Sequence, residues 1–332
     1  MDALIAAWCA RHLGSPAVEQ FFGMQRLSAV HGVRLADGRE VVLKVRPAHP
    51  RQAACVIVQR AAWQAGVPCP EPLAGPHPLA DGVSPVLAPA DEGEPEVDAR
   101  LLAVSAESWE GEGEAGLGDL GSSGWGALLA RMIASAPPVG QLPPLDSEVP
   151  WFWWDHGAPG RTWPPPLSAR WDPHRIDSDI DPVIHEAARR ARPRLLRPDA
   201  ASLSAVAGHS DFEAQNCRWV VGAPGASPRL VVHDWDSVVA RPEAMIAGNS
   251  AVTFASVGEP VMTSLAQNDE FLGAYARERG RPWTPLEWEL AHAAGVWVGA
   301  YNAAFEHLKG GPGPVTAALH AQGEERLRRA GA

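Results

Sequence analysis

The chain has 332 residues, 46% of them hydrophobic and 20% charged, which is the composition of an ordinary globular protein long enough for two lobes. Its formal net charge of −11 argues against nucleic acid as the main partner, because a phosphate backbone needs a basic surface. No apolar run approaches the ~20 residues that cross a bilayer, and the first residues lack the pattern of a secretory signal. The four cysteines are scattered, so we expect a cytoplasmic protein with reduced thiols and no membrane partner.

The first part of the sequence predicts a small lobe built on an antiparallel sheet. A helix is expected over 2–13, and a strand-rich stretch over 24–45 contains an Asp-Gly turn that suits a hairpin. A second helix is expected over 51–65, and strands near 83–90 complete the lobe. We therefore predict an N-lobe over 1–90 and a larger, mainly helical C-lobe over 91–332.

Lys44 is the one cation inside the apolar run Val41–Val45. A lysine in a buried strand is costly unless it meets an anion, which favours a binding role. The alternative is that Lys44 lies on the solvent face of an edge strand.

The middle of the chain gives weaker signals. Residues 91–114 are rich in Glu, Asp and Gly, with a weakly helical segment over 99–108, and a helix is expected over 125–136. The run Pro-Trp-Phe-Trp-Trp that begins at Pro150 has two interpretations. Its indoles could stack on a sugar or attract an ammonium group, or they could fill the core.

The segment 209–236 carries the strongest functional pattern. It reads His-Ser-Asp-Phe-Glu-Ala-Gln-Asn, then two apolar strands around a Gly/Pro/Ser turn, then His-Asp-Trp-Asp. Such a hairpin would bring Asn216 and Asp234 together at its open end, where one Mg²⁺ could bind both, while Asp211 could orient a hydroxyl. Each residue alone could simply serve a turn or a strand end. The three at this spacing favour phosphoryl transfer.

Further helices are expected after this segment, over 243–254 and 270–279. The clearest begins at Thr284-Pro285-Leu286-Glu287, a capping box with proline at its first position, and ends before Gly310.

These motifs resemble those of the aminoglycoside phosphotransferase and choline kinase superfamily, small-molecule kinases related to the protein kinases. The family's catalytic loop usually reads His-Gly-Asp, four residues and Asn, and its metal motif reads Ile-Asp-Trp or Ile-Asp-Phe. The resemblance implies a two-lobed, protein-kinase-like α+β fold. It also implies ATP and Mg²⁺ as cofactors, with GTP as an alternative donor.

The same resemblance implies roles for individual residues. Asp211 would be the catalytic base, and His209 would brace its loop. Asn216 and Asp234 would bind the metal, and Lys44 would hold the α- and β-phosphates.

The resemblance also implies nucleotide and acceptor contacts. Ser28 lies in the hairpin expected to cover the nucleotide, and Ala88 and Asp91 lie near the expected adenine-binding hinge. The weaker candidates for acceptor contacts are Asp236, Trp153, Trp154, Asn302 and Glu306.

The sequence departs from the family pattern at the helix after the Lys44 strand, which normally carries a Glu that pairs with the lysine. No acidic residue occurs between Val41 and Pro70, and the helix offers only Gln52 and Gln59. Either another element supplies the anion, or amide oxygens hold Lys44, or the alignment fails there.

The leading hypothesis is a kinase that phosphorylates a hydroxyl of a small molecule. An acidic cleft would favour a cationic acceptor molecule. An antibiotic of aminoglycoside or nucleoside type is the preferred acceptor, with a sugar, amino sugar or amino alcohol as the metabolic alternative. Two other hypotheses are a pseudokinase that binds nucleotide without turnover, and a Zn²⁺ or Mn²⁺ hydrolase. The hydrolase site would use His209, Asp211, His233, Asp234 and Asp236.

Overall fold

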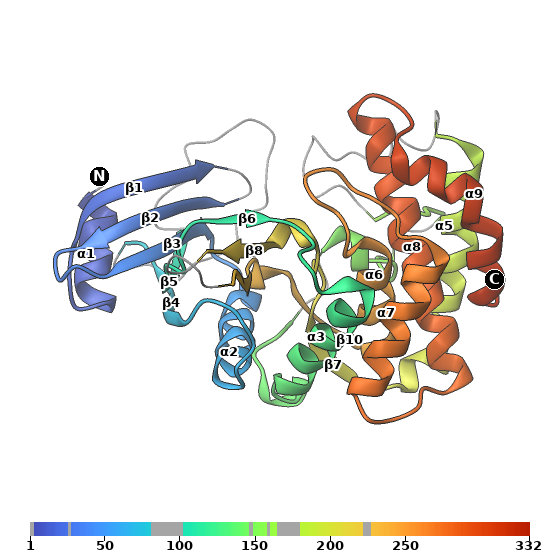
Figure 1. Ribbon diagram of the computed structural model, residues 1–332, viewed down its shortest axis with the longest axis horizontal. Helices are drawn as coiled ribbons and strands as arrows, with labels where there is room; N and C mark the ends of the chain where they lie inside the picture. The colour runs from blue at the N-terminus through green and yellow to red at the C-terminus, as the bar shows by residue number, and fades with distance from the viewer. Residues whose placement is uncertain are drawn as a thin grey trace. The chain divides into compact units, whose positions relative to one another are not determined.

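The computed structural model describes residues 3–25, 28–80, 102–145, 149–157, 160–164, 180–221 and 227–332. The chain divides into two compact units, which we call the sheet unit and the helical unit (Figure 1). The sheet unit comprises Met1–Gly113, Leu142–Leu145 and Val220–Asp236. The helical unit comprises Glu114–Gln141, Asp146–Trp219 and Ser237–Ala332.

The sheet unit is built on a five-stranded antiparallel sheet with the order β1-β2-β3-β5-β4. Its strands are β1 (Ala17–Gln25), β2 (Ala29–Leu35), β3 (Glu40–Pro47), β4 (Pro72–Pro78) and β5 (Leu102–Ser108). The helices among its described residues are α1 (Ala3–His12) and α2 (Arg51–Gln64), both close to their predicted ranges. The predicted turn between β2 and β3 is also present, with Gly38 at φ +88°.

The two faces of β3 have different environments because side chains alternate along a strand. Val41, Leu43 and Val45 lie in a core that also contains Trp8 of α1 and Val104 of β5. Lys44 and Arg46 therefore project from the opposite face.

Of the segment over 99–108, predicted as weakly helical, residues 102–108 instead form strand β5, which hydrogen-bonds to β3 on one side and β4 on the other. Residues 99–101 lie outside the described residues. The short Ala and Ser residues of β5 fit either structure locally, and pairing on both edges decides the conformation. The sheet unit consequently extends past the boundary predicted at residue 90. The strands expected near 83–90 lie outside the described residues.

The helical unit contains a bundle of helices and one short antiparallel sheet. Its helices are α3 (Gly121–Ser135), α5 (Pro182–Leu195), α6 (Glu243–Thr253), α7 (Leu265–Glu278), α8 (Pro285–Lys309) and α9 (Pro314–Arg329). Its sheet pairs β7 (Ala205–His209) with β10 (Val238–Pro242). Two further strands, β6 (Gly113–Ala115) and β8 (Cys217–Val220), lie where the chain passes from one unit to the other, and β9 (Arg229–Val232) lies in the sheet unit.

The long helix α8 packs against α5, α6 and α9 (Figure 1). Two glycines allow close approach between helices in this unit. A Cβ at Gly248 of α6 would lie 2.0 Å from the carbonyl oxygen of Ala291, and one at Gly126 of α3 would lie 2.2 Å from that of Phe271. Neither contact leaves room for a side chain, so both positions need glycine.

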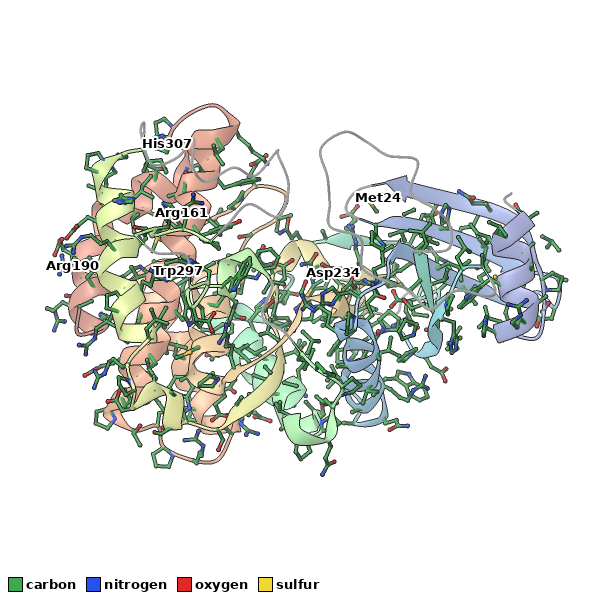
Figure 2. All side chains as sticks on the ribbon, turned by 180° about the vertical axis from the view of Figure 1, so that it is seen from behind. Met24, Arg161, Arg190, Asp234, Trp297 and His307 are labelled. Carbon is green, nitrogen blue, oxygen red and sulfur yellow. The ribbon has the colours of Figure 1, made fainter. Side chains whose placement is uncertain are left out.

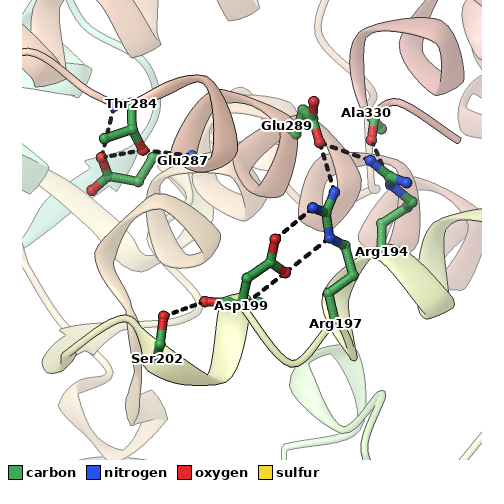
Figure 3. Close-up of polar contacts among 9 residues, drawn as sticks. Arg194, Arg197, Asp199, Ser202, Thr284, Glu287, Glu289 and Ala330 are labelled. Atoms are coloured by element: carbon green, nitrogen blue, oxygen red, sulfur yellow. Dashed lines mark hydrogen bonds and ion pairs between the residues drawn. The ribbon is translucent and has the colours of Figure 1, made fainter.

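The predicted capping box at the start of α8 is confirmed (Figure 3). The amide of Glu287 donates to the Thr284 hydroxyl at 3.3 Å, and the amide of Thr284 donates to the Glu287 carboxylate at 2.8 Å. Nearby, Glu289 accepts hydrogen bonds from Arg194 and Arg197, which connects α8 to the end of α5. No helix among the described residues is long and apolar enough to span a membrane.

His292 in α8 gives the fold a predicted pH dependence. Burial, with Arg329 and Arg326 nearby, lowers the pKa of His292 to about 4, against about 6.5 in an unfolded chain. Between these values the unfolded state binds a proton that the folded state does not, so stability falls as the pH drops. Urea unfolding would give the free energy of unfolding at pH 7 and at pH 4.5. The decrease between these two pH values should be about 2 kcal/mol smaller for His292→Gln than for the wild type. Equal losses in the two proteins would contradict this assignment.

Candidate active-site residues

The loop that carries Asp211 begins in the helical unit where β7 ends. His209, the last residue of β7, pairs with Val238 of β10. The amide and the hydroxyl of Ser210 both donate to the carbonyl oxygen of Ser237, at 2.9 and 2.6 Å. Ser210 is fully buried, and its hydroxyl is satisfied by this hydrogen bond.

Asp211 is held by hydrogen bonds from both ends of its loop. The Nδ2 atom of Asn216 donates to the Asp211 carboxylate at 2.8 Å and to its carbonyl oxygen at 2.9 Å. The backbone amide of Asp211 donates to Nδ1 of His209 at 3.2 Å, which requires that this ring nitrogen carry no proton. Because the Asn216 nitrogen faces Asp211, the amide oxygen is the Asn216 atom suited to Mg²⁺.

Two residues distant in sequence also hold this loop. The Ser210 carbonyl oxygen accepts hydrogen bonds from Nδ2 of Asn249 at 2.8 Å and from the indole nitrogen of Trp151 at 3.2 Å. Asn249 comes from α6 and has no local signal in the sequence that would link it to the loop. Trp151 belongs to the aromatic run, but its contact is with the loop backbone.

Replacing Trp151 with Phe should remove one hydrogen bond from the Ser210 carbonyl. We expect a loss of about 1 kcal/mol in unfolding free energy, together with a reduced kcat because the backbone beside Asp211 is less constrained. Trp219→Phe is the matched control, since its indole donates to Gly116 at 2.8 Å. Urea unfolding and steady-state kinetics would measure both, and equal kcat values in the two variants would argue against a role for Trp151.

Glu213 is a buried acid beside Asp211 that the sequence analysis did not single out. Burial, together with the charge of Asp211, raises the pKa of Glu213 well above its usual range. Gln215 donates to the Glu213 carboxyl at 2.6 Å. The available signal was the acidic residue placed directly after Asp211-Phe212.

The predicted metal motif lies in the sheet unit, immediately after β9. Asp234 has φ +62°, and among the described residues it is the only one other than glycine with a positive φ. Aspartate tolerates this left-handed conformation better than most residues. The turn is anchored by the buried Trp235, whose indole donates to Val232 at 3.0 Å, and by the Val232 amide, which donates to Pro68 at 2.7 Å. Figure 2 labels Asp234.

Lys44 lies in a nearly buried cluster of charges in the sheet unit. Its Nζ is 3.2 Å from the Glu107 carboxylate and 3.8 Å from that of Asp236, with a side chain that is 12% exposed. Arg46 forms an ion pair with the same Asp236. The Asp236 carboxylate thus pairs with two cations, and an acceptor contact at this residue stays a prediction.

The alternatives left open for Lys44 are resolved by strand β5. β3 is paired on both sides, so the edge-strand interpretation is wrong. The anion comes from another element, Glu107 of β5, and Gln59 of α2 donates to that carboxylate at 3.0 Å. Burial opposes the charge of Glu107, but Lys44, His233 and the Gln59 hydrogen bond keep its pKa below the usual value.

Of the two tryptophans proposed for the acceptor, Trp154 belongs to the core. It is 2% exposed, packs against Phe152 and Trp297, and has the Arg241 guanidinium 5.1 Å from its ring centre (Figure 2 labels Trp297). Little of the Trp154 surface reaches solvent, and a ligand contact at this residue stays a prediction. Trp153 is partly exposed and remains a candidate.

Glu306 also has a structural role. Its carboxylate accepts hydrogen bonds from the amides of Gly313, Val315 and Thr316, and from the Thr316 hydroxyl, at 2.8 to 3.0 Å. These groups form the N-terminus of α9, where a negative charge is favourable. The helix α9 was not among the predicted elements, and an acceptor contact at Glu306 stays a prediction. Asn302 is partly exposed on α8 and stays a candidate.

The predicted nucleotide contacts lie in two places. Ser28 directly precedes β2, next to the connection from β1. Ala88 and Asp91 lie outside the described residues. β5 leads into the segment 109–113, at the end of which the chain leaves the sheet unit. The Trp109 ring at its start lies 5.4 and 5.3 Å from those of Phe21 and Phe22.

The transition-metal alternative gains no support from side-chain clustering. Within the described ranges no group of three or more His, Cys, Asp or Glu side chains is arranged to hold a metal ion. Asp234 and Asn216 offer a carboxylate and an amide oxygen, which are hard ligands of the kind that Mg²⁺ prefers.

Solved structures give the comparison that identifies the fold. An amicoumacin kinase in complex with AMP-PNP, Ca²⁺ and Ami is 11% identical, with a TM-score of 0.57 over 99% of this chain and 94% of that one. A spectinomycin phosphotransferase in complex with ADP and spectinomycin is 12% identical, with a TM-score of 0.50 over 98% and 92% of the two chains. The chain has the fold of this kinase and this phosphotransferase. The predicted two-lobed, protein-kinase-like fold is thereby confirmed. No protein-family model matches the sequence, and no curated protein matches it.

Proposed function

We propose that the protein is an ATP- and Mg²⁺-dependent phosphotransferase that phosphorylates a hydroxyl of a small molecule. The observation that carries this proposal is the hydrogen bond from Asn216 to the Asp211 carboxylate at 2.8 Å, in a protein of this fold. Phosphoryl transfer depends on positioning and charge neutralisation, so a catalytic carboxylate held before substrate binds is the main requirement.

The described residues supply the other functions that the reaction needs. Asp211 orients the acceptor hydroxyl and accepts its proton. Asn216 and Asp234 would hold Mg²⁺, which when bound neutralises charge on the phosphates. Lys44 contributes a cation that would bind the nucleotide phosphates. The phosphates would compete for Lys44 with the carboxylates of Glu107 and Asp236.

We also propose that the segment 109–113 contacts the nucleobase, in place of the hinge expected at Ala88 and Asp91. β5 runs beside the Lys44 strand and leads directly into this segment. The partly exposed rings of Trp109, Phe21 and Phe22 offer aromatic surface on which a base can stack.

For the acceptor we propose an antibiotic of aminoglycoside or nucleoside type. The net charge of −11 suits a cationic compound. Two structures of the same fold were solved with Ami and with spectinomycin, which gives a starting point for choosing acceptors. A sugar, amino sugar or amino alcohol is the metabolic alternative.

A turnover assay tests the proposed function. Purified protein would be incubated with Mg²⁺ and ATP, or GTP, across aminoglycosides, nucleoside antibiotics, amino sugars and choline-like alcohols. Acceptor-dependent ADP or GDP release that is abolished by EDTA would support the proposal and name the acceptor class. Nucleotide binding without transfer to any acceptor would favour the pseudokinase, whose main argument, the missing helix Glu, is weakened by Glu107.

A further inference from the structure

Glu107 is a buried carboxylate on β5, in a segment that the sequence did not predict to be a strand. Its side chain is 7% exposed and lies 3.2 Å from Nζ of Lys44, which is 12% exposed. Burying either charge alone would be strongly unfavourable, so each makes the position of the other possible.

The pair is built between two neighbouring strands. Lys44 of β3 lies opposite Ser105 of β5, and Glu107 follows Ser105 on the same face of the sheet. Diagonal neighbours on one face of an antiparallel sheet are within reach of a long side chain. Backbone hydrogen bonds between β3 and β5 therefore fix the distance between lysine and carboxylate.

The helix contributes an amide rather than a charge. Nε2 of Gln59 in α2 donates to the Glu107 carboxylate at 3.0 Å and to the Pro70 carbonyl at 3.1 Å. Gln59 is 5% exposed, so these bonds satisfy a buried donor. α2 thus supports the carboxylate that pairs with Lys44.

We propose that Glu107 is the positioning residue for Lys44, so that the phosphate-binding lysine is assembled within the sheet and independently of α2. This inference rests on the proposed function. In protein kinases the partner carboxylate comes from a helix, and the position of that helix controls whether the pair forms. With both partners on hydrogen-bonded strands, a shift of α2 cannot separate them. The phosphate site is therefore constitutively assembled.

The test is a double-mutant cycle between Lys44→Met and Glu107→Gln, read as dissociation constants for ATP, ADP and adenosine by calorimetry. Glu107→Gln should lower the affinity for ATP and for ADP about tenfold, the scale of one charge-assisted hydrogen bond, and leave the affinity for adenosine unchanged. In the Lys44→Met background it should have no further effect on ATP. Additive effects on ATP, or an equal loss for adenosine, would overturn the inference.

Two further variants separate the strand from the helix. Gln59→Leu should lower the affinity for ATP less than about threefold, since it removes a neutral donor from the Glu107 carboxylate and leaves the charge of that carboxylate in place. A loss equal to that of Glu107→Gln would show that α2 positions Lys44, against the proposal. Glu40→Gln is the matched control, because Glu40 lies on β3 and its ion pair with Arg34 is exposed.

Failure of this inference is distinguishable from failure of the proposed function. Wild-type protein that binds ATP but transfers phosphate to no acceptor would overturn the proposed reaction, and the binding cycle would still decide the role of Glu107. Wild-type protein that does not bind ATP would overturn both.

Discussion

Asp211→Asn should lower kcat for phosphotransfer by at least about a hundredfold, the lower end of what a general base contributes. The substitution keeps the size of the side chain but removes its charge, so it can no longer accept the proton of the acceptor hydroxyl. Asn216 donates to the affected carboxylate and would still find an oxygen acceptor there. We therefore expect little change in unfolding free energy or in the affinity for ATP.

Single-turnover kinetics with Mg²⁺ and ATP, together with calorimetry, would check this result. Asp119→Asn is the control, since Asp119 is an exposed residue of the same unit outside the catalytic loop. A variant at Asp211 that retained more than about a tenth of the wild-type kcat would exclude it as the base.

Asp234→Asn should weaken the binding of Mg²⁺-ATP by at least about a hundredfold, because even outer-shell partners of a metal site typically contribute 10- to 100-fold. Asparagine is the informative replacement because it also tolerates the φ of +62° found at this position. An alanine would add backbone strain to the loss of the ligand. The asparagine variant therefore tests the charge of Asp234 with the turn intact.

The measurement is a titration of ATP at several Mg²⁺ concentrations. In the wild type ATP affinity should rise with Mg²⁺, and in Asp234→Asn this dependence should be largely absent. Affinity for adenosine should be the same in both proteins. An unchanged response to Mg²⁺ in the variant would show that Asp234 is not a metal ligand.

Trp154 and Glu306 differ from the other acceptor candidates in their long-range packing. Trp154 and Glu306 carry side chains that suit a ligand, and nothing adjacent in sequence shows how they are used. Trp154 is covered by Trp297, and Glu306 is occupied by the start of α9. The burial of the Trp154 indole depends on a residue more than a hundred positions away in the sequence. The hydrogen bonds of Glu306 depend on α9, which was not predicted.

Residues whose chemistry depends on short spacing could be identified from the sequence alone. Asp211 and Asn216 lie on one loop, and their hydrogen bond follows from local geometry. The helix start at Thr284 follows from a local capping box, and the turn after β2 follows from an Asp-Gly pair. Such features need only a few consecutive residues, so the sequence contains all of their causes.

The partner of Lys44 could be identified only from the tertiary structure. The helix that follows β3 carries no acidic residue. The partner, Glu107, lies instead on β5, which becomes a strand by pairing with β3 and β4. The contact between Ser210 and Asn249 is equally remote in sequence. Strand pairing and burial bring together residues that have no fixed spacing, and a single sequence carries no local record of which of them meet.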